Sequence, residues 1–208
     1  MIGWLRRLCA WITPLTQVNE GQHVHIALRR GLDNDRPSAT LATVLDRVHG
    51  NCEERRNAAY DLGRFASQDA LPALLKLLDD SDEYVRTYAI QSIVRLNDTS
   101  AVPDLVHHAK STQPGLVLTN IIRALAELRD RRATPALCEL LSSTEPMVRY
   151  DAAFALGEIQ DPDSLEALAK WTADSTMPTS GDVVATVMSV GEMVQKSIHK
   201  IKRGNRAR

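Results

Sequence analysis

The segment "MVRYDAAFALGEIQDPDSLEAL", from Met147 to Leu168, decides the fold of this chain. Its apolar residues recur every three or four positions up to Ile159, which is the spacing of an amphipathic helix. A polar turn with an Asp-Pro pair follows, and a second helix then begins. The segment "YVRTYAIQSIVRLNDTSAVPDL", from Tyr84 to Leu105, has the same plan, so the sequence predicts a repeated pair of helices.

The repeat keeps its register along most of the chain. Equivalent positions follow one another at steps of 31, 32 and 31 residues. A fixed period of this length is typical of a stacked array. A single helix pair leaves one apolar face uncovered, and the next pair in the array covers it. The two clearest columns of equivalent positions are Ala58, Ala89, Ile121 and Ala152, and Phe65, Leu96, Leu128 and Ile159.

Two stretches of the chain carry a family resemblance. "VRYDAAFALGEIQDPDSLEAL" and "RRNAAYDLGRFASQDALPALLKLLDDSDEYVR" resemble the HEAT-like repeat named from phycobilisome (PBS) bilin lyases. The resemblance is strong over residues 53–171, and residues 18–50 read as a weaker first copy. It implies a helical solenoid, and it is specific for the fold rather than for one function.

We therefore predict an all-α fold, a right-handed α-solenoid (armadillo/HEAT-like superhelix) of about four to five helix-pair repeats with a C-terminal capping helix. The composition agrees, because 44% of the residues are hydrophobic and only 4% are aromatic. The core must then be built from Leu, Ile, Val and Ala, and both Ala and Leu are strong helix formers.

The chain is expected to divide into four segments. The closing helix should start near Gly181, with Ser180 or Asp182 as its N-cap. The N-terminal segment contains Trp4, Leu8 and Trp11 beside two arginines, and it either docks on the first repeat or lies on a membrane surface. The expected bounds are 1–17 for an amphipathic cap segment, 18–178 for the repeat domain, 179–203 for the capping helix and 204–208 for a basic tail.

The second helices should line the concave face of the solenoid and bind a protein partner there. Large apolar side chains in one column of this face would meet water, and exposed apolar patches mark interaction sites. The alternative is that neighbouring side chains cover this column and that it belongs to the core. The predicted partner-binding residues are Lys76, Leu77, Asp104, His107, His108, Glu139, Leu140, Lys170 and Trp171.

Catalytic and metal-binding patterns are missing from the sequence. It has no Gly-rich phosphate loop, no G-x-S-x-G elbow and no H-E-x-x-H motif. Some HEAT-like enzymes bind two irons through His-Glu dipeptides, and this chain has none. His107 and His108 are adjacent and point about 100° apart on a helix, so they do not chelate one ion together. We predict no catalytic residue, no metal site and no cofactor.

Three further features of the sequence are its cysteines, a column of arginines and a basic tail. Three widely spaced cysteines indicate a reducing compartment and a cytoplasmic protein, with Cys138 in the core. Arg55, Arg86 and Arg149 share a column that Leu118 interrupts, and we interpret it as an inter-repeat ladder of charges and hydrogen bonds. The tail residues Lys196, Lys200, Lys202, Arg203, Arg206 and Arg208 either bind an anionic partner or form a solvated terminus.

These patterns favour a non-catalytic protein-binding scaffold or adaptor that uses its concave face. The resemblance implies an alternative, in which the chain is a bilin lyase or chromophore-handling chaperone subunit acting on a phycobiliprotein beside a second repeat subunit. His107, His108 and Trp171 would then contact the pigment. A second alternative is binding of nucleic acid or an anionic membrane surface through the basic tail. No transmembrane segment is expected, because no apolar run approaches about 20 residues.

Overall fold

The computed structural model describes residues 40–65, 67–180, 183–184 and 188–206. These all belong to one compact unit, Pro37–Arg208. The expected cap segment 1–17, the first part of the weaker repeat copy, the N-cap candidate Asp182 and the tail residue Arg208 lie outside the described residues.

The described unit consists mainly of paired helices. The first helices of successive pairs are α4 (Cys52–Leu62), α6 (Glu83–Leu96), α8 (Leu116–Leu128) and α10 (Pro146–Ile159). The second helices are α3 (Leu41–Arg47), α5 (Leu71–Lys76), α7 (Val102–Ser111), α9 (Thr134–Leu140) and α11 (Leu165–Ala169). The chain closes with α12 (Val190–Arg206), after a short antiparallel hairpin of β1 (Thr179–Ser180) and β2 (Val183–Val184).

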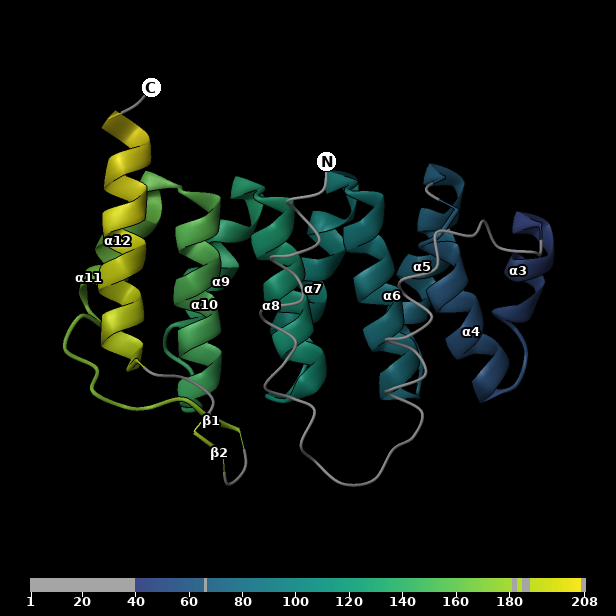
Figure 1. Ribbon diagram of the computed structural model, residues 1–208, viewed down its shortest axis with the longest axis horizontal. Coiled ribbons are helices and arrows are strands. Elements are labelled where there is room, and N and C mark those ends of the chain that lie inside the picture. Colours follow the sequence, from purple (N-terminus) through teal and green to yellow (C-terminus); the bar gives the residue numbers. More distant parts are fainter. Residues whose placement is uncertain (1–39, 66, 181–182, 185–187, 207–208) are drawn as a thin grey trace. The chain divides into compact units, whose positions relative to one another are not determined.

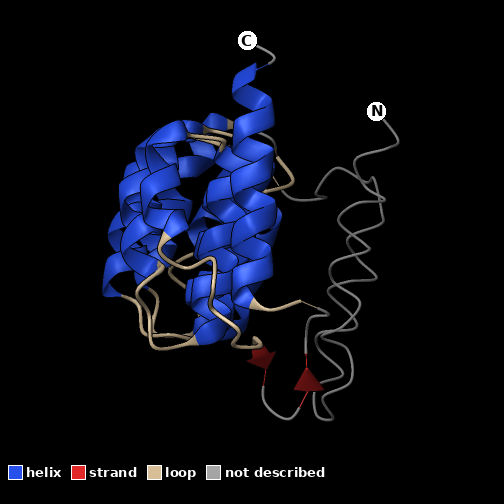
Figure 2. Cartoon of the chain, turned by 90° about the vertical axis from the view of Figure 1, so that its left-hand side faces the viewer, coloured by secondary structure: helices blue, strands red, loops and turns tan. Residues whose placement is uncertain are grey.

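The first helices stand side by side in sequence order, from α4 through α6, α8 and α10 to α12 (Figure 1). The second helices form a layer behind them, and Figure 2 looks along both layers from the end occupied by α12. Each pair therefore covers the apolar side of the pair before it, and the predicted all-helical α-solenoid is confirmed.

The same turn chemistry joins the two helices of the three pairs α6–α7, α8–α9 and α10–α11. Three first helices end at a residue in the left-handed region, Asn97 (φ 51°), Arg129 (φ 53°) or Gln160 (φ 57°). The following aspartate accepts a hydrogen bond from the backbone N–H two residues later, as Asp98 does from Ser100 at 2.9 Å. A short 3₁₀ turn then leads into the second helix. These turns are η4 (Thr99–Ala101), η5 (Arg131–Ala133) and η6 (Pro162–Ser164). Aspartate suits the position before each turn because its side chain folds back onto nearby backbone N–H groups. In the α4–α5 pair the 3₁₀ turn η2 (Gln68–Ala70) is capped by Ser67, whose Oγ accepts from the N–H of Asp69 at 3.2 Å.

The repeat columns lie where the sequence places them. Ala58, Ala89, Ile121 and Ala152 are all buried between neighbouring first helices. In the second column Leu128 and Ile159 are buried, whereas Phe65 and Leu96 are half-buried and pack against the core. Small residues let the first helices approach closely. A Cβ added at Gly157 would lie 2.6 Å from the Ser197 Oγ of α12.

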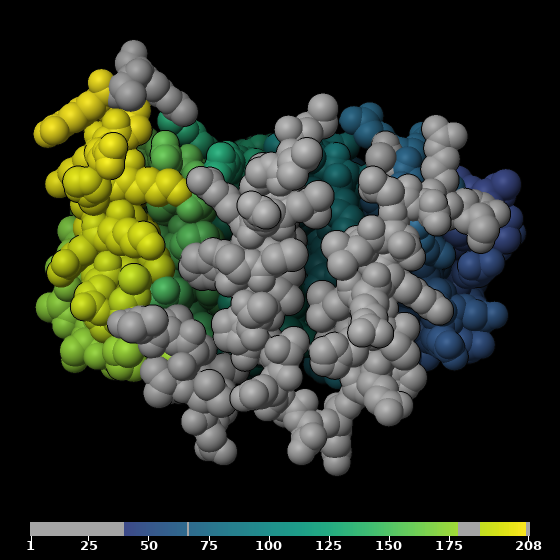
Figure 3. All heavy atoms as spheres, viewed as in Figure 1, coloured from purple at the N-terminus to yellow at the C-terminus, as the bar shows by residue number. Residues whose placement is uncertain are grey.

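α12 completes the row in the position of one more first helix. A Cβ added at Gly63 would lie 2.4 Å from the Ser92 Oγ of α6, which is the same close approach that Gly157 makes to α12. The apolar side of α12 packs on α10 and α11, with Val190, Val194 and Ile201 buried. Figure 3 shows the side chains of α12 along the outer edge of the row. Among the described residues, no helix is long and apolar enough to cross a bilayer.

Two predicted boundaries are wrong. The closing helix starts at Val190 rather than near Gly181, and it runs on to Arg206, so residues 204–206 are not a separate tail. Ser189 is the true N-cap, because its Oγ accepts from the N–H of Glu192 at 3.3 Å. The Glu192 carboxylate accepts in return from the N–H of Ser189 at 2.6 Å. The proposed cap Ser180 belongs to β1 instead.

Candidate functional site on the second-helix face

The predicted partner-binding residues lie on the second helices or directly after them. Asp104, His107 and His108 lie on α7, and Glu139 and Leu140 end α9. Lys76 is the last residue of α5, and Lys170 and Trp171 follow α11. We call this surface the second-helix face. Its exposed members are Lys76, Asp104, His107, Glu139 and Lys170.

The expected exposure of the apolar column is wrong. Leu77 is only 5% exposed and belongs to the core. Leu140 and Trp171 are half-buried and pack against the same core. The physical reason is that α5 ends at Lys76 and continues as the 3₁₀ helix η3 (Leu77–Asp79). A 3₁₀ helix turns faster than an α-helix, so Leu77 rotates inward.

Trp171 has a structural role. The Arg149 guanidinium lies 5.4 Å from the centre of its ring. Arg149 is itself buried and donates to the Asp174 carboxylate at 2.8 Å and to the backbone oxygens of Ser143 at 2.8 Å and Thr144 at 3.0 Å. The tryptophan therefore covers an arginine that ties two loops together.

Two hollows open between neighbouring second helices. The first has a volume of about 550 Å³ and lies between α3 and the α5–η3 segment. Its lining includes Leu45, Val48, Ala73, Lys76 and Leu77. The second has a volume of about 320 Å³ and lies between α7 and α9. Its lining includes Lys110, Leu118, Ala136, Glu139 and Leu140. Four of the predicted partner-binding residues thus line the hollows.

The polar groups of the second-helix face are partly paired. Lys110 Nζ lies 3.0 Å from a carboxylate oxygen of Glu139. His108 is mostly buried, and its Nε2 lies 3.9 Å from the Asp79 carboxylate. Its ring meets the ring of His107 edge-on at 5.7 Å. His108 is thus mostly buried beside Asp79 of η3, whereas His107 is exposed.

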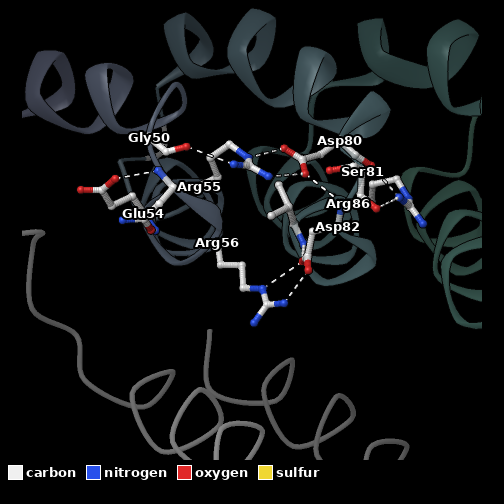
Figure 4. A network of polar contacts seen from close by, with 10 residues as sticks. Gly50, Glu54, Arg55, Arg56, Asp80, Ser81, Asp82 and Arg86 are labelled. Atoms are coloured by element: carbon white, nitrogen blue, oxygen red, sulfur yellow. Dashed lines mark hydrogen bonds and ion pairs between the residues drawn. The ribbon is translucent and has the colours of Figure 1, made fainter.

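Two members of the arginine column, Arg55 and Arg149, bond to the loop of the following repeat as predicted, whereas Arg86 bonds within the loop before its own helix; Figure 4 shows Arg55 and Arg86. Arg55 donates to both carboxylate oxygens of Asp80, at 2.6 and 3.0 Å, and to the backbone oxygen of Gly50 at 3.0 Å. The Arg55 guanidinium holds the pKa of the Asp80 carboxyl below its ordinary value. Arg86 donates to the backbone oxygens of Asp80 and Ser81.

At Leu118 the ladder is replaced by apolar packing, since this residue is buried. Neighbouring Arg56 holds both oxygens of Asp82, and this hydrogen-bonded pairing lowers the pKa of the Asp82 carboxyl.

Sequence reasoning missed one buried acid, Asp151 of α10. Burial raises the pKa of its carboxyl to about 6, although the Arg123 guanidinium of α8 lies 3.7 Å from its Oδ1. Its Oδ2 has no hydrogen-bond partner. The sequence signal for its burial was its position next to Ala152, which belongs to a column of buried residues. Asp151 lies between first helices, away from the second-helix face.

Other candidate groups do not gather into a site. Among the described residues, no three His, Cys, Asp or Glu side chains lie close enough to hold a metal ion. Cys138 is half-buried against the core, and burial raises the pKa of its thiol. On α12, Lys200 pairs with Glu158, while Lys196, Lys202, Arg203 and Arg206 are exposed.

The comparisons with known proteins point to one family. The family model described as HEAT repeats matches residues 38–120 and 115–179. The chain is 33% identical over 169 residues to the phycocyanobilin lyase subunit alpha of Microchaete diplosiphon, covering 74% of this chain and 53% of that protein. It is 30% identical over 186 residues to the same subunit of Nostoc sp., covering 83% of this chain and 64% of that subunit.

A shorter match is to deoxyhypusine hydroxylase of Bos taurus, 31% identical over 99 residues, covering 47% of this chain and 29% of that enzyme. The chain thus spans less than a third of that hydroxylase and roughly half to two thirds of the lyase subunits. Among solved structures, the complex of CpcE and CpcF of phycocyanin lyase from Nostoc sp. PCC7120 matches with a TM-score of 0.63 at 19% identity. That match covers 83% of this chain and 68% of the other, and it shows a shared fold.

Proposed function

Because the chain belongs to the family of HEAT-repeat proteins, we propose that it is a non-catalytic protein-binding module that holds its partner on the second-helix face. Its repeats are of the type found in phycocyanobilin lyase alpha subunits. Such arrays present extended surfaces that recognise other proteins. The partner is a second protein subunit or a client protein of that subunit.

The pair of hollows on the second-helix face is the observation that carries this proposal. Each hollow has an apolar floor, formed by Leu77 in one and Leu140 in the other, and charged residues at its rim. Interfaces of this kind bury apolar anchors in pockets and surround them with polar groups. The first hollow has the exposed carboxylates Asp69 and Asp79 at its rim against the single cation Lys76, whereas Glu139 at the second hollow is paired with Lys110. This difference in charge favours one orientation of the partner.

The test is affinity purification of the full chain with charge-reversed variants. We expect the double variant Asp69→Lys, Asp79→Lys to lose at least about tenfold in partner recovery, because reversing the acidic rim of the first hollow costs more than about 1.4 kcal/mol. Both residues are exposed, so the variant should fold. Gln91→Lys on α6 is the matched control, since it adds a charge at an exposed position on a first helix. Equal recovery by the double variant and the control would contradict the proposal.

A second candidate function rests on the long match to the lyase alpha subunits. By that likeness the chain acts as a bilin lyase or chromophore-handling chaperone subunit on a phycobiliprotein, together with a second repeat subunit. His107 is the exposed group on the second-helix face that would meet a pigment. We expect a purified chain with this function to shift the absorbance of added linear tetrapyrrole, and His107→Ala to reduce the shift. An unchanged spectrum, with and without the second subunit, would reject this candidate.

A further inference from the structure

We infer that one extended segment of the protein partner crosses the second-helix face and places an apolar side chain in each of the two hollows, six residues apart, with a basic residue beside the first. This inference rests on the proposed function and specifies the chemistry of the partner. The hollows, the repeat register and the rim charges each supply one part of it.

The two hollows are the same feature, repeated two units apart. Ala73 and Leu77 of the first hollow have Ala136 and Leu140 as their counterparts in the second. The rim position of Lys76 in the first corresponds to that of Glu139 in the second. Each hollow exists because a small alanine faces the groove and the leucine four residues later packs against the core. A repeated recess of this kind suits a ligand with a repeated anchor.

In the intervening repeat a histidine takes the place of the leucine. His108 is the counterpart of Leu77 and Leu140, and it lies mostly buried against Asp79. Asp104 takes the place of the small alanines and is exposed. A partner segment that spans the two hollows therefore crosses α7 over the exposed Asp104 and His107.

The distance between the hollows sets the spacing of the anchors. Packed helices lie about 8–10 Å apart, so two repeats separate equivalent points by roughly 16–20 Å. An extended chain rises about 3.3 Å per residue, so six residues cover about 20 Å. Six is an even number, and alternate side chains of a strand point to the same side. Anchors five or seven residues apart would point to opposite sides.

The rim charges fix the direction of the segment. The first hollow has two exposed carboxylates at its rim, Asp69 and Asp79, against the single cation Lys76, while Asp80 is neutralised by Arg55. At the second hollow Lys110 and Glu139 pair with each other, and Ser142 and Ser143 are neutral. A Lys or Arg beside the first anchor is therefore favoured, and no charge is needed beside the second.

The test uses fluorescent 12-residue peptides with two leucines separated by alternating Ser and Thr. We expect the peptide with leucines six residues apart and a Lys beside the first to bind the full chain at least tenfold more tightly than peptides with spacings of five or seven. Replacing that Lys by Glu should weaken binding severalfold. Equal affinities for all three spacings, or no binding by any of them, would overturn the inference.

Two variants tie the binding to the hollows. Ala73→Leu fills the first hollow and should abolish the spacing preference, whereas Ala169→Leu, at an exposed position of α11, should leave it intact. Asp79 has an 81% exposed side chain, so Asp79→Lys should fold and should reverse the preference from the Lys peptide to the Glu peptide. If the natural partner depends on Asp69 and Asp79 but no peptide shows a spacing preference, this inference fails while the proposed function stands.

Discussion

At the scale of single residues, Asp151 is the most costly group in the described part of the chain. Its carboxyl is buried, its Oδ2 is unpartnered, and Arg123 reaches only its other oxygen, at 3.7 Å. Burial disfavours the charged form, which raises its pKa from 3.8 to about 6. The folded state therefore binds this proton more tightly than the unfolded state. The contribution of this one carboxyl to stability is fully present below about pH 4 and is lost as the pH rises through 6.

We expect Asp151→Asn to stabilise the protein at pH 8, by up to about 3 kcal/mol, because about two pKa units correspond to roughly that free energy. The gain should shrink as the pH falls and vanish near pH 4, where the carboxyl is protonated in both states. Urea unfolding at pH 5 and pH 8 measures the difference. Asp163→Asn is the control, since Asp163 is exposed in a turn. A variant less stable than the natural chain at pH 8 would contradict the assignment of burial as the cause.

At the scale of elements, the start of α12 is set by tertiary contacts as well as by its cap. The N–H of Val190 donates to Thr176 at 3.0 Å, and the N–H of Gly191 donates to Asp174 at 2.7 Å. A Cβ at Gly191 would lie 2.8 Å from the backbone oxygens of Thr172 and Asp174. The valines before α12 recur at a spacing that suits a helix, but these loop contacts place the boundary later. Local pattern alone could not give them.

The hydrogen bonds between Ser189 and Glu192 predict how much stability is lost when the N-cap of α12 is removed. Ser189→Ala deletes the acceptor for the N–H of Glu192 and leaves the helix start with one more unsatisfied donor. We expect a loss of about 1 kcal/mol in the free energy of unfolding, measured with urea. Ser175→Ala, in the exposed loop before β1, should change little. Equal effects of the two changes would show that Ser189 does not cap the helix.

The element scale also shows why part of the candidate site escaped prediction. Helical spacing places the columns of the first helices well, because these helices have 11 to 14 residues. The second helices α5 and α11 have only six and five residues. After Lys76 the helix α5 continues as the tighter 3₁₀ helix η3. Continuing the α-helical spacing to Leu77 therefore gives the wrong orientation for this side chain. Lys76 is the last residue of α5, Glu139 is the last but one of α9, and both side chains are exposed.

At the scale of the whole described unit, the period of 31 or 32 residues was enough to predict the stacked helix pairs. The hollows were not predicted, although the register contains a signal for them in the paired Ala73 and Ala136. A recess depends on the distance between neighbouring helices, and the spacing of residues in the sequence does not give that distance. Asp151 escaped for the same reason, since its burial is produced by packing between repeats.

The stacking of the helix pairs leads to a prediction about their mutual stability. In a linear array each unit is stabilised by its neighbours, so a defect in the middle weakens both sides and a defect at the edge weakens one. Ile121 of α8 is 1% exposed between α6 and α10, whereas Val44 of α3 is fully buried at one end of the described array. We expect Ile121→Ala to cost about 2–5 kcal/mol and to speed amide hydrogen exchange in α6, α8 and α10. Val44→Ala should speed exchange only in α3 and α4, because the first helices beyond them still cover one another. Exchange that increased in α8 alone after Ile121→Ala would mean that each pair is stable by itself, which the uncovered apolar face of a single pair does not allow.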